Sequence, residues 1–132
     1  MITKRLISRI LLPVLITVCL LGCRRKSIES YDPQKDVARQ AIEKSLGAWK
    51  SGKPLATIAG TPAIDTFDAR WRSGTKLEDF SILEEVPGQE HPQFKVQLHF
   101  PGKPVESADY IVVGIDPLLV FRKEDYLKAS GM

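Results

Sequence analysis

The spacing of apolar side chains changes from a helical period to a strand period along this chain, and that change limits the fold to a helix joined to a sheet. Between residues 37 and 49, one stripe of side chains recurs at three- and four-residue intervals, the period of an amphipathic helix. From residue 76 onward apolar and polar residues alternate, most regularly over residues 93–100, as in a strand with one buried face. The helical stripe consists of Val37, Ala38, Ala41, Ile42, Ser45, Leu46 and Trp49, and the strand face of Phe94, Val96, Leu98 and Phe100.

The sequence also marks both ends of the predicted helix. Asp32 can cap the first turn, Pro33 suits the first helical position, and Asp36 places negative charge near the positive end of the helix dipole. Gly52 can supply a left-handed cap, and Pro54 prevents the helix from continuing. We therefore expect a helix that begins at Pro33 and ends just before Gly52.

Residues 54–74 join the helix to the sheet and are less regular. Residues 55–59 are compatible with one further helical turn, which a Gly-Thr-Pro sequence then ends. Residues 63–68 alternate loosely and predict a short edge strand, and residues 68–71 predict a helical turn.

Four longer strands follow, separated by turns that contain proline and glycine. They cover residues 76–85, 93–100, 108–115 and 118–122, and a short helical turn comes after them. Because parallel strands need crossover connections of about a dozen residues, the short connections specify an antiparallel meander. The expected fold class is α+β, with an N-terminal amphipathic helix packed on a curled antiparallel sheet of four or more strands. We find no internal repeat and no second linker.

The N-terminal segment has the organisation of an export signal. Three basic residues within the first nine positions precede an apolar, uncharged run over residues 10–21, and Gly22 and Cys23 follow. A membrane-spanning helix needs about 20 apolar residues, and this run is shorter than that. The segment is interpreted as a cleaved signal, and the alternatives are an uncleaved membrane anchor and an apolar N-terminus without a targeting role.

Leu20, Leu21, Gly22 and Cys23 resemble the lipobox of bacterial lipoproteins. The resemblance implies cleavage between Gly22 and Cys23, lipid such as palmitate on Cys23, and a location in the bacterial cell envelope. The domain would then lie outside the cytoplasm, anchored to the membrane through the lipid on Cys23. On this interpretation residues 1–22 are the signal peptide, residues 23–31 a membrane-proximal tether, and residues 32–132 a single domain.

Loss of the signal would change the charge balance of the protein. The full chain has 19 basic and 16 acidic residues, and three basic but no acidic residues lie within the signal, so the mature protein has 16 of each. Such a balance gives no electrostatic reason to expect a nucleic-acid partner. Cys19 would be removed and Cys23 lipidated, so the domain has no cysteine for a disulfide, a thiolate metal site or a nucleophile.

The aromatic residues have two interpretations. Trp49, Trp71, Phe80, Tyr110 and Phe121 are candidate linings of an apolar ligand cavity. A single domain also needs such side chains in its core, where burial of apolar surface stabilises the fold by about 25 cal/mol per Å². The core interpretation is favoured, and the cavity is the alternative.

Few residues are candidates for catalysis or metal binding. His99 lies on the polar face of its predicted strand, where it is either a general base in a concave pocket or a solvated side chain, and His91 lies in a loop. Asp65 and Asp68 have the spacing of paired carboxylates, although capping or turn roles are favoured. We find no metal-ligand spacing and no cofactor motif, and therefore predict no metal, no cofactor and no catalytic residue.

Four short segments carry a second resemblance: residues 48–52 (Ala-Trp-Lys-Ser-Gly), 70–74 (Arg-Trp-Arg-Ser-Gly), 110–114 (Tyr-Ile-Val-Val-Gly) and 119–122 (Leu-Val-Phe-Arg). They resemble small bacterial lipoproteins with the cystatin-like, or nuclear-transport-factor-2-like, cone fold, in which a sheet wraps around a helix. The resemblance spans about residues 33–123 and implies architecture and envelope location, without an activity. Isomerases of this fold use tyrosine and aspartate, but Asp109 and Tyr110 are adjacent in a strand and would point to opposite faces.

Two function classes follow from these observations. The leading prediction is a membrane-tethered envelope lipoprotein, whose domain is a non-enzymatic binding or interaction module for a protein partner or a small apolar ligand. The alternative is an enzyme of the cone-fold isomerase or dehydratase type that uses a pocket histidine or aspartate. A pocket that contains His99 and a carboxylate within hydrogen-bonding distance would favour the enzyme.

Overall fold

The computed structural model of the protein describes residues 32–131. The predicted signal peptide, Cys23 and the tether lie outside the described residues. Within residues 32–131, no helix has the length and apolar composition needed to cross a membrane. The helices are α2 (Lys35–Lys50), α3 (Ala69–Arg72) and α4 (Lys123–Ala129), and the strands are β1 (Ile64–Phe67), β2 (Asp79–Glu85), β3 (Gln93–His99), β4 (Glu106–Val113) and β5 (Leu118–Arg122).

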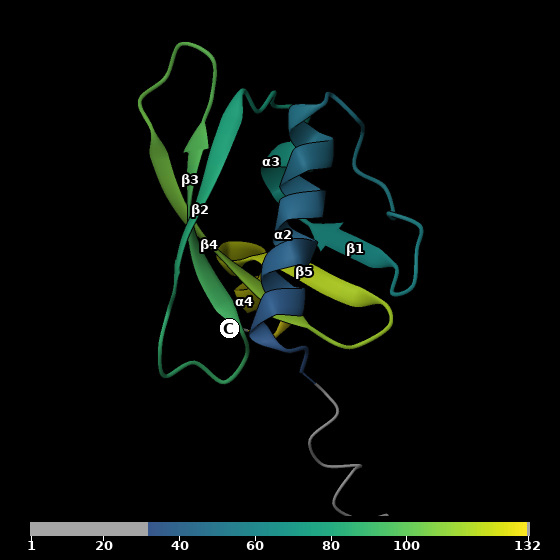
Figure 1. Cartoon of the computed structure of the whole chain (residues 1–132). Coiled ribbons are helices and arrows are strands. Elements are labelled where there is room, and N and C mark those ends of the chain that lie inside the picture. Colours follow the sequence, from purple (N-terminus) through teal and green to yellow (C-terminus); the bar gives the residue numbers. More distant parts are fainter. Residues whose placement is uncertain (1–31, 132) are drawn as a thin grey trace, which may run out of the picture. The chain divides into compact units, whose positions relative to one another are not determined.

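The strands form one mixed sheet in the order β1-β5-β4-β3-β2, with β1 and β2 at its edges (Figure 1). The predicted antiparallel meander is confirmed, because β2, β3, β4 and β5 each pair with the next strand in antiparallel orientation. The prediction of a wholly antiparallel sheet is wrong, because β1 pairs in parallel with β5. The chain between β1 and β5 contains α3, β2, β3 and β4, so it is long enough for the crossover that parallel pairing requires.

Two strands have bounds that differ from the expected ones by two residues or more. β2 begins at Asp79, and the buried side chain of Leu77 belongs to the linker that precedes it. β4 covers Glu106–Val113 and ends earlier than expected, because Gly114 turns the chain with a φ of +85°. A Cβ at Gly114 would lie 2.8 Å from the carbonyl oxygen of Pro117, so the turn requires glycine there.

α2 packs against the sheet, and the core lies between them (Figure 1). The buried side chains of α2 are those of the predicted stripe, apart from Val37, which is 36% exposed. The polar member of the stripe, Ser45, is buried and accepts a hydrogen bond of 2.8 Å from the hydroxyl of Thr66 in β1. The core side chains of β3, β4 and β5 come from alternate positions and include Phe94, Val96, Leu98, Tyr110, Val112 and Val120.

Phe121 lies on the other face of the sheet, because it follows Val120, whose side chain points into the core. Its ring stacks on Phe67 of β1 with ring centroids 4.5 Å apart, and it meets the edge of Tyr126 in α4 at 5.5 Å. Phe121 therefore does not share a cavity with the other candidate aromatic residues. Phe121 is buried, as the core interpretation expects, but it lies outside the core cluster that contains Trp49, Trp71 and Tyr110.

α2 begins later than the sequence predicted. Gln34 occupies the N-cap position without a capping hydrogen bond from its side chain. Asp32, the predicted cap, instead places its Oδ1 atom 2.7 Å from Nδ1 of His91, in the loop between β2 and β3. The capping prediction is wrong because the carboxylate has a partner from a distant part of the chain.

The irregular segment before the sheet contains the predicted edge strand, β1, and the predicted helical turn, α3. Asp68 is the N-cap of α3, and its side chain accepts hydrogen bonds from the amides of Arg70 and Trp71. The helical turn expected over residues 55–59 is not formed. Ile58 instead makes an antiparallel bridge with Ile64, the first residue of β1.

Gly47 and Gly52 allow a matched test of how α2 ends. Gly52 has a φ of +83° and donates its amide to the carbonyl of Trp49, so a side chain there is strained. Gly47 lies inside α2, with nothing within 4 Å of its Cβ position. We expect Gly52→Ala to lower the free energy of unfolding by about 1 kcal/mol and Gly47→Ala to raise it by about 0.5–1 kcal/mol, as measured by urea unfolding. An unchanged or higher free energy of unfolding in Gly52→Ala would contradict the assignment of Gly52 as the left-handed residue that ends α2.

Candidate functional site

Two four-residue segments with the same pattern end α2 and α3. Trp49-Lys50-Ser51-Gly52 closes α2, and Trp71-Arg72-Ser73-Gly74 closes α3. In each segment serine is the C-cap, and the following glycine has a positive φ, +83° at Gly52 and +88° at Gly74. The two helices therefore end in the same way, with a serine cap followed by a glycine in the left-handed conformation.

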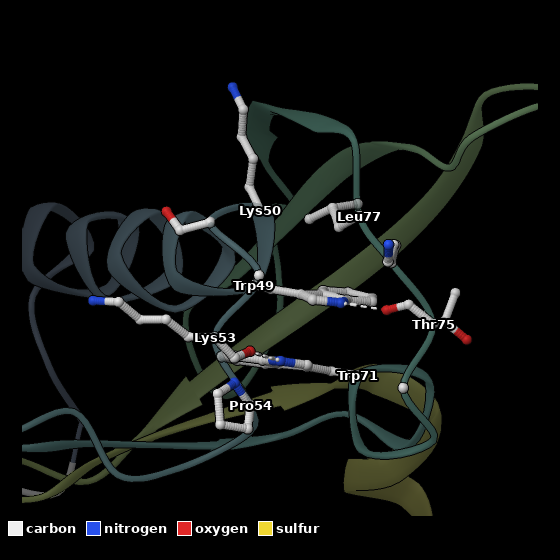
Figure 2. A pocket seen from close by; sticks show the side chains of 11 residues that line it. Trp49, Lys50, Lys53, Pro54, Trp71, Thr75 and Leu77 are labelled. Carbon is white, nitrogen blue, oxygen red and sulfur yellow. Dashed lines mark hydrogen bonds between the residues drawn. The ribbon is translucent and has the colours of Figure 1, made fainter.

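The two tryptophans stack on each other, and the indole N–H of each donates a hydrogen bond to the loop that follows the other tryptophan (Figure 2). Their ring centroids are 5.8 Å apart, and the ring planes differ by 12°. Nε1 of Trp49 donates to the carbonyl oxygen of Thr75 at 2.7 Å, and Nε1 of Trp71 donates to the carbonyl oxygen of Lys53 at 2.9 Å. Each acceptor lies four residues after the other tryptophan. We call these two residues, with their two hydrogen bonds, the tryptophan pair.

Two hollows in the surface lie against the tryptophan pair. The first has a volume of about 410 Å³ and is lined by both tryptophans, residues 50–54 and residues 74–77 (Figure 2). The second has a volume of about 550 Å³ and shares Trp71 and the segment around Lys53 and Pro54 with the first. Trp49 is 3% exposed and Trp71 4%, so their rings present almost no free face on which a ligand could stack.

The candidate cavity linings are mostly core residues. Trp49, Trp71 and Tyr110 belong to the hydrophobic core, and Phe80 is partly buried against it. The core interpretation therefore holds for these four residues. Trp49 and Trp71 line the first hollow and belong to the core at the same time.

Lysines surround the two hollows, and no aspartate or glutamate lines either of them. Nζ of Lys50 lies 3.0 Å from Oδ1 of Asp79, outside the hollow. This hydrogen bond from Lys50 is the main reason that the pKa of the Asp79 carboxyl lies below its ordinary value. The lysines are Lys44, Lys50, Lys53 and Lys76.

A buried aspartate and tyrosine meet beneath α3. Asp68 is fully buried and accepts hydrogen bonds from the amides of Arg70 at 2.9 Å and Trp71 at 3.3 Å, and from the hydroxyl of Tyr110 at 2.5 Å. Burial, followed by the charge of Asp68, raises the pKa of Tyr110 well above its ordinary value. The capping role favoured for Asp68 is confirmed. Tyr110 therefore pairs with Asp68 and not with the adjacent Asp109. Asp109 accepts a hydrogen bond of 2.9 Å from the side chain of Gln93 in β3.

An ion-pair cluster connects α3 to β4 and β5. Glu106 accepts from Arg70 at 2.6 Å and from Arg122 at 3.2 Å, and Arg122 also donates to Glu124 at 3.1 Å. The hydrogen bond from Arg70 holds the pKa of Glu106 below its ordinary value. Arg122 is 8% exposed, and its Nη1 atom has no hydrogen-bond partner among the residues that the structure describes. The cluster holds the start of α3 against the end of the sheet.

The two histidines have different surroundings. His99 lies on the less buried face of β3, opposite Asp79 of β2, and it lines neither hollow of the tryptophan pair. His91 pairs with Asp32, and its ring lies edge-on to Tyr126 with centroids 6.0 Å apart. Within residues 32–131, no three side chains of histidine, cysteine, aspartate or glutamate are grouped so that they could hold a metal ion.

The surface around the tryptophan pair combines hollows, a packed floor and unbalanced positive charge, and it is therefore the candidate functional site of the domain. Comparisons of the chain with protein-family models, with curated proteins and with solved structures find no match. The candidate site consequently rests on its residues and their geometry.

Proposed function

We propose that the protein is a lipoprotein of the bacterial cell envelope, whose domain is a non-enzymatic binding or interaction module. The observation that carries this proposal is the sequence Leu20–Cys23, which follows an apolar, uncharged run and precedes the domain by only a short polar segment. Lipid on Cys23 would hold the domain at the membrane. Arg24, Arg25 and Lys26 come directly after it, where each contact with an anionic lipid head group would contribute about 1 kcal/mol.

The packing of the domain supports a binding role at its surface. α2 lies against the curled sheet, and we propose that this arrangement is a cystatin-like cone. Ile42, Leu46 and Val96 are fully buried between helix and sheet, so side chains occupy the space in which a cone-shaped domain would hold a ligand. Recognition of a partner would then use the outer surface, where the two hollows of the tryptophan pair lie.

The alternative is an isomerase- or dehydratase-type enzyme that uses a histidine or an aspartate. The hydrogen bond between Tyr110 and Asp68 is the observation that favours it, because these residue types serve acid–base chemistry. Both residues are fully buried, however, and neither lines the two hollows. A substrate would have no access to their reacting atoms, and the binding role is therefore the better supported of the two.

The anchor is tested by Cys23→Ser, with Cys19→Ser as the matched control, because each variant removes one sulfur atom from the N-terminal segment. We expect the wild-type protein and Cys19→Ser to be found in bacterial membranes and to incorporate radioactive palmitate. Cys23→Ser should incorporate none, because its hydroxyl replaces the thiol that carries the lipid, and it should be released or kept as the larger precursor. Cell fractionation and metabolic labelling measure both properties.

Two results would contradict the lipoprotein proposal. One is an intact N-terminus on the wild-type mature protein, detected by mass spectrometry. The other is equal incorporation of palmitate into the wild-type protein and Cys23→Ser.

A further inference from the structure

The end of the domain at the tryptophan pair carries an excess of positive charge. We call this surface the basic end, and define it as the two hollows with the lysines that line them. Both α2 and α3 end here. The negative end of the helix dipole is by itself a sufficient reason for a lysine in the last turn of a helix. Lys50 fits that explanation, because it lies in the last turn of α2 and also pairs with Asp79.

The helix dipole does not account for Lys44 or Lys76, and local ion pairs do not account for Lys44, Lys53 or Lys76. Lys44 lies before the last turn of α2, and Lys76 lies in the linker after α3, whereas the dipole acts only within the last turn. Lys44, Lys53 and Lys76 form no ion pair with any residue in the part of the chain that the structure describes. All three are exposed, so the basic end presents charges that an external anionic group can approach.

The surface between these lysines is apolar, and hydrogen bonds fix the loops that form it. Ala48, Pro54, Ala56 and Ile58 line the second hollow, and Leu77 lines the first. The loops that carry Lys53 and Lys76 are positioned by the hydrogen bonds of the tryptophan pair, which end on the carbonyls of Lys53 and Thr75. Such a surface is organised before binding, which lowers the entropic cost of association.

The opposite end of α2 carries the opposite charge. Asp32 and Asp36 lie at the start of α2, which is the end that the tether joins, and Glu85 and Glu90 belong to β2 and the loop after it. His91 pairs with Asp32, and Lys35 pairs with Glu85. These contacts bring the carboxylates together at the start of α2. The 16 residues of α2 separate the two ends by about 24 Å, at a rise of about 1.5 Å per residue. The carboxylates at this end would repel an anionic lipid surface, whereas the basic end would repel a cationic one.

We propose that the basic end binds a segment of a partner protein that contains both acidic and apolar residues. Carboxylates of that segment pair with Lys44, Lys53 and Lys76, and its apolar side chains occupy the two hollows. This inference rests on the proposed interaction function and adds the surface and the chemical class of the partner. Charge complementarity of this kind raises the association rate and weakens as salt screens the lysines.

The test uses the full-length, anchored protein in bacterial cells, with benzoylphenylalanine as a photo-crosslinking residue. The probe replaces Ala56 in the second hollow, and in separate proteins it replaces Gln89 near the acidic end or Ser107 on β4, all of which are exposed. The Ala56 probe is then combined with Lys53→Glu and Lys76→Glu, or with the matched control Lys128→Glu in α4. Thermal melts of the purified variants show that each still folds.

We expect the Ala56 probe to crosslink to a protein segment that sequencing shows to be net negative and to contain apolar residues. Lys53→Glu with Lys76→Glu should reduce this crosslink by about tenfold or more, as should high salt, whereas Lys128→Glu should leave it unchanged. A crosslink from Ala56 to lipid, to glycan or to a neutral or basic segment would overturn the inference, and so would no effect of the charge reversals. Crosslinks to protein only from Gln89 or Ser107 would overturn the location and leave the interaction function standing. No protein crosslink from any of the three positions would overturn the interaction function as well.

Discussion

Trp49→Ala and Trp71→Ala should each lower the free energy of unfolding by about 3–5 kcal/mol. Each ring is at least 96% buried, stacks on the other and donates a hydrogen bond to the other's following loop. The expected loss is a large share of the about 5–15 kcal/mol that stabilises a typical domain. Residues 32–131 contain no cysteine, so no disulfide of the domain offsets the loss. Thermal and urea unfolding measure the change, and a variant that fails to fold is the extreme of the same result.

His99→Ala is the control, because His99 lies on the less buried face of β3, and its stability should change by no more than about 0.5 kcal/mol. Trp49→Phe separates packing from hydrogen bonding, since it keeps a ring but leaves the carbonyl of Thr75 without its donor, at a cost of about 1–3 kcal/mol. The double variant of Trp49 and Trp71 should show a coupling energy of about 0.5–3 kcal/mol, because the two residues touch. A larger effect of His99→Ala than of Trp49→Ala would mean that the faces of β3 have been assigned the wrong way round.

Asp68→Ala should lower the free energy of unfolding by about 2–4 kcal/mol. The substitution removes the N-cap of α3 and leaves the hydroxyl of Tyr110 without its acceptor in the core. Asp65→Ala is the matched control: Asp65 belongs to β1, and its hydrogen bond with Thr57 is exposed, so the change should stay below about 1 kcal/mol. Equal effects in urea unfolding would show that burial of the Asp68–Tyr110 hydrogen bond contributes nothing.

The same pair predicts how stability depends on pH in the alkaline range. Because the pKa of Tyr110 is raised in the folded protein, this group contributes its full stability below the ordinary tyrosine pKa of about 10. Above that pH the unfolded chain loses the tyrosine proton while the folded protein keeps it, so stability falls as the pH rises. Tyr110→Phe should be less stable than the wild type at pH 8 and should lose less stability between pH 9 and 11. An unchanged slope in Tyr110→Phe would contradict the role of Tyr110 in this loss of stability.

The helix, the meander and the edge strand were predictable because their signals are local. The stripe of α2 from Ala38 to Trp49 and the alternation of β3 repeat within a few residues, and Gly52 marks where α2 ends. The capping role of Asp68 was predictable for the same reason, since its hydrogen bonds reach only two and three residues along the chain. For the candidate site, the sequence identified Trp49 and Trp71 as buried aromatic residues.

The arrangement of these residues around each other was not predictable from periodicity. The two hydrogen bonds of the tryptophan pair join residues that are 26 and 18 positions apart, and Tyr110 and Asp68 are 42 positions apart. Asp32 has the residue type and position of a cap, and its contact with His91, 59 residues away, overrides that local preference. β1 likewise has no local signal for its parallel pairing with β5.

By itself, the sequence determined which longer segments of the domain form a helix or a strand, because the hydrophobic period acts over one or two turns. It also determined the N-terminal resemblance to a lipoprotein signal, which depends only on the order of basic, apolar and small residues before Cys23. The tertiary structure decided which donors meet which acceptors, which face Phe121 occupies, and that four lysines gather around two hollows. These properties depend on how the whole core packs, and hydrophobic periodicity carries no information about which distant residues the packing brings together.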